Sequence, residues 1–287
     1  MKTAIMTDTN SGISAKEIAE LGIYAISMPV IIDGEVYFEG QTITEEEFFD
    51  ALRSGKDVST SQPSPGEVLA MWDQILADGY DELVYIPMSS ALSTSCATAK
   101  ALADDYDGKV EVADNHRISL TQHDSVIRAL SMAKGGKSAA EIKQQLEEEA
   151  YTASIYLTVN TLEYLKKGGR VTPAAAMIGT LLSIKPILSI QGEKLDAFTK
   201  VRGPMKKCYK TMIKALQKDM ETRFADCDQS KLSVGVAGAG LSAEEIADAT
   251  GILQEAFPQA KVYYDPLSAS ISCHTGPGAV GMGISFR

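Results

Sequence analysis

The feature that most constrains the fold is an alternation of short apolar runs and helix-like segments over the first 150 residues. Strand-like segments at 2–8, 83–86 and 110–113 are each followed by a polar turn and then by helical spacing. Such alternation is typical of a parallel sheet, because parallel strands need a crossover that is usually a helix. We therefore predict an N-terminal α/β domain over residues 1–150, Rossmann-like and mainly parallel.

A second α/β domain is predicted over residues 151–287. It begins with an apolar run at 155–159 and contains a long helical pattern at 204–222. Its glycine-rich apolar end, 279–286, has the composition of a last strand. In the first domain, residues 24–32 are expected to form one strand, because the run is almost continuously apolar.

A double glycine followed by an arginine, Gly168-Gly169-Arg170, ends a predicted helix near the middle of the chain. Glycine reaches a positive φ at little cost and commonly terminates helices. One interpretation is a plain stop between two core helices. The other is that Arg170, a bidentate donor on a tight turn, faces an anion.

Hydroxyl side chains gather in two segments that follow predicted strands, Thr60-Ser61 and the run 89–95. A serine nucleophile on a hydrolase elbow needs Gly-x-Ser-x-Gly, and no glycine occurs in 87–100. The hydroxyls either cap the following helix or donate to one carboxylate, since an α/β sheet collects ligands at the carboxyl ends of its strands. We favour a carboxylate site that contains Ser93.

Two glycine-containing segments resemble nucleotide-binding motifs but lack required residues. Gly-Gly-Lys-Ser at 135–138 ends like a phosphate-binding loop, yet Ser131 occupies the earlier glycine position. The glycines Gly235, Gly238 and Gly240 stand in the wrong order for a dinucleotide fingerprint. Histidines and cysteines show no metal-ligand spacing, so we expect no nucleotide, metal or other cofactor.

The acidic balance of the chain limits its partners. Net charge is −11, with 45% hydrophobic and 23% charged residues, as in a soluble globular protein. Nucleic acids and anionic membranes favour basic surfaces, so neither is an expected partner. The most apolar window, 23–32, is too short to cross a bilayer, no signal peptide is apparent, and the four cysteines are scattered. We predict a cytoplasmic protein without stable membrane insertion.

Several segments, in order along the chain, resemble the DegV family, bacterial proteins that carry fatty acids. These segments are Thr7-Asp8-Thr9, Thr60-Ser61-Gln62-Pro63, Ser89-Ser90-Ala91-Leu92-Ser93, the run 162–188 and His274-Thr275-Gly276-Pro277-Gly278. They span essentially the whole chain. The resemblance implies a DegV-like fold of two α/β domains with the ligand site between them.

The resemblance also implies a function. A long-chain fatty acid would lie in an interdomain tunnel and present its carboxylate to a separate fatty acid kinase, which forms the acyl-phosphate. The head-group residues that it implies are Thr60, Ser61, Ser93 and His274. Arg170 would lie near the head group and face the kinase, and Arg202 resembles the family's kinase-contacting arginine. The protein would be a carrier without catalytic residues of its own.

Two alternatives stay open at this point. Ser93 and His274 are the residue types of an esterase or acyltransferase, because a serine with a histidine base can form an acyl-enzyme. A regulatory or sugar-binding domain without a lipid is the second alternative.

A lysine repeat lies outside the matched segments. The predicted helix at 204–222 carries a lysine every four residues, at Lys206, Lys210, Lys214 and Lys218. Lysines on a solvated helix face are ordinary. In an acidic chain, however, this cationic stripe is also a candidate docking surface for an acidic face of the kinase.

Overall fold

The computed structural model describes residues 2–176 and 184–287, which form three sheets. The first is a parallel four-stranded sheet in the order β2-β1-β6-β7. Its strands are β1 (Thr3–Asp8), β2 (Tyr24–Ile26), β6 (Glu82–Ile86) and β7 (Val110–Val112). All four point their carboxyl ends to one edge, and every residue of β6 is buried, as expected for a sheet covered on both faces.

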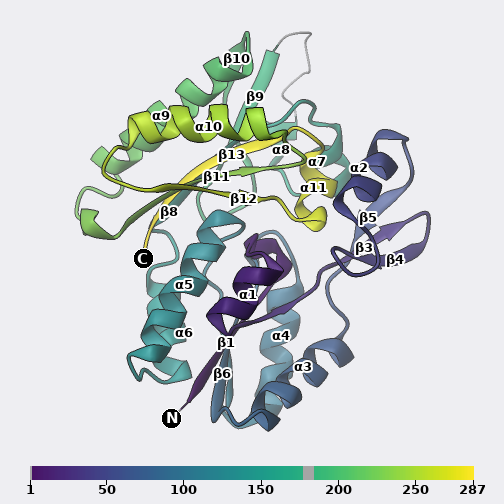
Figure 1. Cartoon of the computed structure of the whole chain (residues 1–287), viewed down its shortest axis with the longest axis vertical. Helices are drawn as coiled ribbons and strands as arrows, with labels where there is room; N and C mark the ends of the chain where they lie inside the picture. The colour runs from purple at the N-terminus through teal and green to yellow at the C-terminus, as the bar shows by residue number, and fades with distance from the viewer. Residues whose placement is uncertain (1, 177–183) are drawn as a thin grey trace.

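Helices cover both faces of this sheet (Figure 1). One face packs against α3 (Pro65–Ala77) and α4 (Ser95–Ala103). The other packs against α1 (Ala15–Leu21), α5 (Leu120–Lys134) and α6 (Ala139–Glu148). Short 3-10 turns, η1 (Thr9–Ser11) and η2 (Asp104–Tyr106), lie in the connections. The predicted parallel α/β arrangement of the first half is confirmed.

The six-stranded sheet is mixed, in the order β10-β9-β8-β13-β11-β12. Its strands are β8 (Ala153–Thr158), β9 (Ile184–Ile190), β10 (Asp196–Arg202), β11 (Leu232–Gly238), β12 (Val262–Pro266) and β13 (Val280–Phe286). Only β11 and β12 pair in parallel. One face is covered by α9 (Met205–Glu221) and α10 (Ala243–Ala256), with η3 (Gln229–Lys231) preceding β11.

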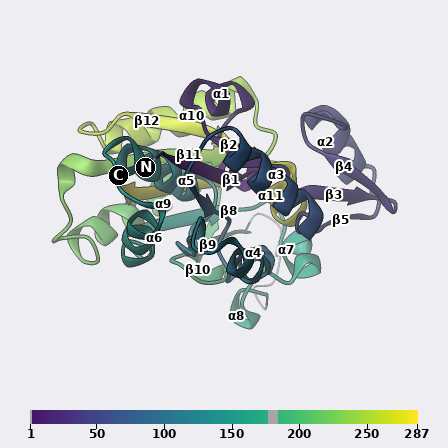
Figure 2. The same ribbon diagram turned by 90° about the horizontal axis from the view of Figure 1, so that it is seen from below.

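A three-stranded antiparallel sheet stands to one side of the four-stranded sheet, as Figure 2 shows from below. It consists of β3 (Pro29–Ile32), β4 (Glu35–Phe38) and β5 (Val58–Thr60), with α2 (Glu45–Arg53) inserted before β5. This sheet packs against α11 (Ala269–Thr275), which in turn packs against α7 (Glu163–Gly168). The one-turn helix α8 (Pro173–Ala176) follows α7.

The expectation of a single strand over residues 24–32 is wrong. The segment divides into β2 of the four-stranded sheet and β3 of the three-stranded sheet. Pro29 has no N–H for a ladder and restricts the conformation of Met28, so the chain leaves one sheet and starts another at this point. A consequence is that Met28 lines a cavity at the carboxyl edge of the first sheet.

Helix α5 lies between the two larger sheets. It contacts β1 and β6 on one side and β8, β11 and β13 on the other. The largest apolar cluster likewise joins residues from both halves of the chain, from Met28 to Ala279. Sheet membership changes between β7 and β8, and the division into domains 1–150 and 151–287 stays a proposal. Among the described helices, none is long and apolar enough to cross a membrane.

Candidate functional site

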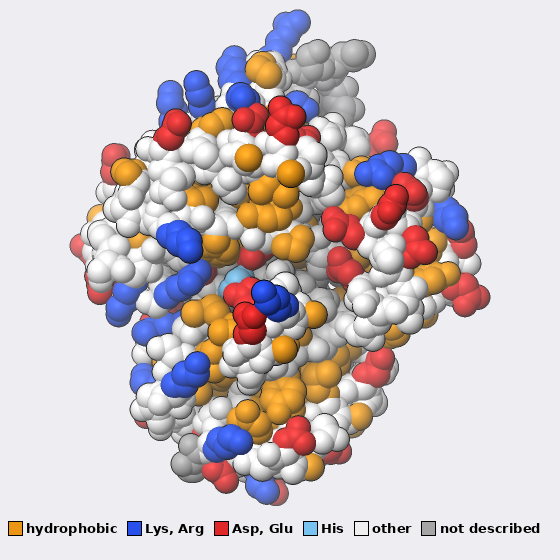
Figure 3. Space-filling model, in the orientation of Figure 1, with side chains coloured by type: hydrophobic (Ala, Val, Ile, Leu, Met, Phe, Trp, Pro, Cys, Tyr) orange, Lys and Arg blue, Asp and Glu red, His pale blue; other side chains and the backbone are white. Residues whose placement is uncertain are grey.

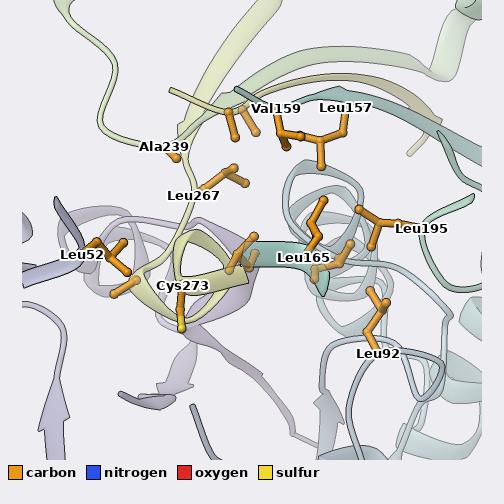
Figure 4. Packing of buried hydrophobic residues seen from close by; sticks show 14 of the residues in the cluster. Leu52, Leu92, Leu157, Val159, Leu165, Leu195, Ala239, Leu267 and Cys273 are labelled. Atoms are coloured by element: carbon orange, nitrogen blue, oxygen red, sulfur yellow. The ribbon is translucent and has the colours of Figure 1, made fainter. Parts of the chain in front are cut away.

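A cavity of about 260 Å³ lies where the carboxyl ends of the parallel strands face the six-stranded sheet. Loops after β2, β6 and β7 form one wall, and side chains of β8, β9 and β11 form the other. The carboxyl edge of a parallel sheet is the usual ligand site of α/β folds. Most of the lining is apolar, and Figure 4 shows Leu92, Leu157, Leu165 and Leu195 converging on one region.

The polar lining gathers the residues that the sequence predicted for a carboxylate site. The cavity is lined by the four residues implied for the head group, Thr60, Ser61, Ser93 and His274, together with Arg170. They come from the end of β5, the β6–α4 loop, the turn after α7 and the helix α11. Ser61 is exposed, so this polar side of the cavity faces solvent. Arg202 does not line the cavity and lies exposed at the end of β10.

His274 and Thr60 form a hydrogen-bonded pair within this group. His274 Nε2 lies 2.9 Å from Thr60 Oγ1, across a sequence separation of more than two hundred residues. Burial, together with the nearby charge of Arg170, lowers the pKa of His274 to about 4. The imidazole is therefore neutral near pH 7 and acts as a hydrogen-bonding group rather than as a cation.

The two glycines before Arg170 serve different purposes. Gly169 has φ 68°, and its N–H bonds to Leu165 O at 3.0 Å, so it is the left-handed residue that ends α7. Gly168 is needed for space, because a Cβ there would lie 2.1 Å from His274 Nδ1. The double glycine is thus both a helix stop and the surface on which the His274 ring rests.

Arg170 is fixed by two backbone carbonyls. Its Nε donates to Leu92 O at 3.2 Å, and its Nη1 donates to Gly168 O. These bonds tie the turn after α7 to the β6–α4 loop, and they fix the position of a guanidinium that lines the cavity. An oriented guanidinium beside hydroxyl groups is suited to an anionic oxygen ligand.

Ser93 is part of a tight hydroxyl turn at the start of α4. Its Oγ accepts from Ser95 N at 3.2 Å, a local bond to the first residue of α4, whereas the N-cap residue Thr94 makes no side-chain capping bond. Among the described residues no hydrogen bond joins Ser93 to His274, because His274 Nε2 faces Thr60. The serine–histidine pair of an esterase is therefore not assembled in this arrangement.

Several polar lining residues were missed as site candidates, among them Gln62 and Thr94. Gln62 Oε1 accepts from the hydroxyls of Thr94 and Thr98, each at 3.1 Å. Gln62 and Thr94 both line the cavity beside Ser93. The spacing of the two threonines was the available signal, because the N-cap residue Thr94 and Thr98 in α4 are four apart and such residues lie on one side of a helix.

A metal site has no support in the described residues 2–176 and 184–287. No group of three or more histidine, cysteine or acidic side chains there is arranged to hold an ion. The lining supplies hydroxyls, one guanidinium and one neutral imidazole, which suit an oxygen anion.

Comparison with known families decides the classification. The model of the DegV family, described as uncharacterised proteins, matches residues 2–287. The chain belongs to the DegV family. A DegV domain-containing protein from Deinococcus radiodurans is 31% identical over 285 residues, which cover 99% of this chain and 98% of the relative.

Solved DegV structures share the fold over the full length. A fatty-acid-binding DegV family protein from Thermus thermophilus has a TM-score of 0.87 at 28% identity, with 100% of both chains covered. DegV from Bacillus subtilis, described as a fatty acid binding protein, has a TM-score of 0.82 at 28% identity, again with 100% of both chains covered. The predicted DegV-like fold is confirmed.

Gly168→Ala is expected to destabilise this DegV family member by about 1–3 kcal/mol, the usual cost of forcing extra atoms into a packed site. The added methyl group would displace His274 from its position against α7. Gly251→Ala is the matched control, because Gly251 lies within α10 with open space around it. Alanine there should leave stability unchanged or raise it by up to about 1 kcal/mol. Urea denaturation measures both, and equal effects would contradict the proposed packing.

Proposed function

We propose that this protein binds a long-chain fatty acid in the cavity described above. The carboxylate would lie among Thr60, Ser93 and Arg170, and the acyl tail would lie against the apolar lining. One observation carries the proposal: a single cavity joins a long apolar lining to hydroxyls and an oriented guanidinium at its solvent-facing side. The solved relatives described as fatty-acid-binding support the same ligand class.

The head-group chemistry follows from the neutral state of His274. With its proton on Nε2, His274 donates to Thr60 Oγ1, and the proton of Thr60 stays available for the ligand. Arg170 supplies the positive charge that an ionised carboxylate needs in a partly buried site. His274 is thus a positioning residue for Thr60, and Arg170 is the electrostatic partner of the anion.

Mass spectrometry of denaturing extracts tests the proposal. We expect long-chain fatty acid in roughly one-to-one ratio with the purified protein, and stabilisation when the acid is added to delipidated protein. Ala237→Leu is the matched variant. Ala237 is buried and lines the cavity, so a larger side chain there occupies ligand space and should lower the amount of fatty acid that the protein retains. Extracts without fatty acid, together with no stabilisation on adding it, would overturn the proposal.

We further propose that the protein is a carrier in the cytoplasm, not an enzyme, and that it presents the carboxylate to a separate fatty acid kinase. The solvent-facing position of the polar lining supports access by a partner. The unassembled Ser93–His274 pair offers no support for acyl transfer by this chain alone. Turnover or an acyl-enzyme burst with an acyl ester would contradict the carrier assignment.

The lysine stripe of α9 is the proposed docking surface for that kinase. Figure 3 shows Lys and Arg side chains along the upper edge of the molecule, over α9 and β10. All four lysines of the stripe are exposed, but Lys206 forms an ion pair with Asp248 of α10 at 2.9 Å. The other three lysines of the stripe, Lys210, Lys214 and Lys218, form no ion pair with any described residue. They therefore carry the positive charge that is not neutralised within the protein, and Arg202 lies before the helix.

The double variant Lys210→Glu/Lys214→Glu is expected to slow association with the kinase several-fold at low salt, because electrostatic steering depends on the charge of the facing surfaces. Fatty acid affinity should not change. Lys134→Glu/Lys137→Glu makes the same charge change at two exposed positions, the last residue of α5 and the loop after it, and serves as the control. Stopped-flow association at two ionic strengths measures the effect. Equal rates for the two double variants would remove α9 from the docking surface.

A further inference from the structure

Ser119 has an unusual conformation at the wall of the cavity. It follows β7, directly before α5, with φ 55° and ψ −136°. Positive φ is uncommon for residues other than glycine, and it persists where tertiary contacts impose it. Two backbone bonds hold this residue: its N–H donates to Asn10 O at 3.0 Å, and its carbonyl accepts from His123 N at 2.9 Å.

The side chain of Ser119 does not cap the helix that it precedes. Serines at five other helix starts do so, each accepting from a backbone N–H of the first turn: Ser14, Ser64, Ser138, Ser242 and Ser268. Ser119 lies at the same kind of position in front of α5 but makes no such bond. It lines the cavity instead.

The hydroxyl of Ser119 is buried and unpartnered. The residue is only 5% exposed, and its Oγ has no hydrogen-bond partner among the described residues. A buried hydroxyl without a partner is costly, so native proteins rarely retain one that nothing satisfies. Its neighbours Ile118 and Leu120 also line the cavity and are apolar, and no head-group residue comes from this loop. Ser119 is therefore a polar point in an apolar stretch of the wall.

We propose that Ser119 binds an oxygen substituent on the acyl chain, so that the cavity accepts a hydroxylated long-chain fatty acid. This inference rests on the proposed function and specifies its ligand. A hydroxyl substituent fits because it both donates and accepts, as Ser119 Oγ does. A second carboxylate does not fit, because Arg170 is the only lysine or arginine among the described lining residues.

Binding of delipidated protein to stearic acid and to positional isomers of hydroxystearic acid tests the inference. We expect the wild-type protein to bind at least one mid-chain isomer as tightly as stearic acid. In Ser119→Ala, affinity for that isomer should fall about tenfold, the scale of one lost hydrogen bond, while affinity for stearic acid should change less than twofold.

Two further variants separate the hydroxyl from other effects. Ser119→Gly removes the hydroxyl and tolerates positive φ, so it should repeat the result of Ser119→Ala even if alanine is strained there. Thr275→Val removes a second buried, unpartnered hydroxyl among the described lining residues, next to His274, and should affect both kinds of acid equally.

The outcomes are distinguishable. If every hydroxystearic isomer binds the wild type more than tenfold weaker than stearic acid, or if Ser119→Ala and Ser119→Gly weaken both acids equally, the inference is wrong and the proposed function stands. If stearic acid itself does not bind, the proposed function fails and the inference fails with it.

Discussion

Shortening a bound acid from sixteen to twelve carbons is expected to lower its affinity more than a hundredfold. Each buried methylene contributes about 0.8 kcal/mol, so four of them contribute about 3 kcal/mol. The lining that these methylenes contact includes Leu157, Leu165 and Ile190. Titration calorimetry across a series of acids of decreasing length measures the slope.

The head-group variants are the matched comparison. Ser93→Ala or Thr60→Val should weaken binding by about 1–2 kcal/mol, because each removes one hydrogen bond to a charged acceptor. The acyl chain would then dominate affinity, and the hydroxyls would set the orientation of the carboxylate. If Ser93→Ala abolished binding while chain length made little difference, the site would be polar and the assignment of the cavity to an acyl tail would be wrong.

Asp124→Ala is expected to lower the free energy of unfolding by about 3 kcal/mol, the low end of the cost of breaking a buried ion pair. Asp124 is 1% exposed on α5 and accepts from Arg287 Nε at 2.6 Å and from the hydroxyls of Ser233 and Ser285. The variant leaves three donors without their acceptor. The expected loss of stability lies at the low end of the range for buried ion pairs because the side chain of Arg287 is 38% exposed and can be solvated by water.

Urea denaturation of Asp124→Ala is best compared with that of Asp50→Ala. Asp50 forms an exposed ion pair with Arg53 at 3.1 Å, so its loss should change stability by less than about 1 kcal/mol. Since Asp124 joins α5 to β11 and β13, its loss should destabilise the contact between the two larger sheets. A change of under 1 kcal/mol for Asp124→Ala would show that this buried network does not hold the sheets together.

Local patterns in the sequence were sufficient for much of the secondary structure. The parallel strands were predictable because both faces of the first sheet are covered, which makes β6 almost continuously apolar and gives β1 an apolar centre, Ala4 to Met6. Helix ends were predictable where the sequence places a glycine for the left-handed conformation that ends a helix, as at Gly169 after α7. The break at Pro29 was missed, because a continuous apolar run does not show which sheet each half joins.

The side chains proposed for the head group could be named from the sequence, but their grouping could not be derived from spacing. Thr60 and His274 lie at opposite ends of the chain and meet because β5 and α11 pack together. The neutral state of His274 is also a tertiary property, because burial and the charge of Arg170 cause it. Gly168 shows the same limit: its need for space exists only once His274 lies against it.

By itself, the sequence determined three strands of the first sheet (β1, β6 and β7), the glycine that ends α7 and the residue types for a carboxylate site. Tertiary structure alone decided that a cavity exists and what faces it. Leu157 and Leu165 line the cavity yet belong to the same apolar cluster as Phe48 and Val159, which do not. An apolar residue has the same pattern whether it meets protein or a ligand, because burial removes it from water in both cases. Only the packing of the two sheets around α5 leaves space beside some of these residues, and only that packing places Ser119 in the wall of the cavity.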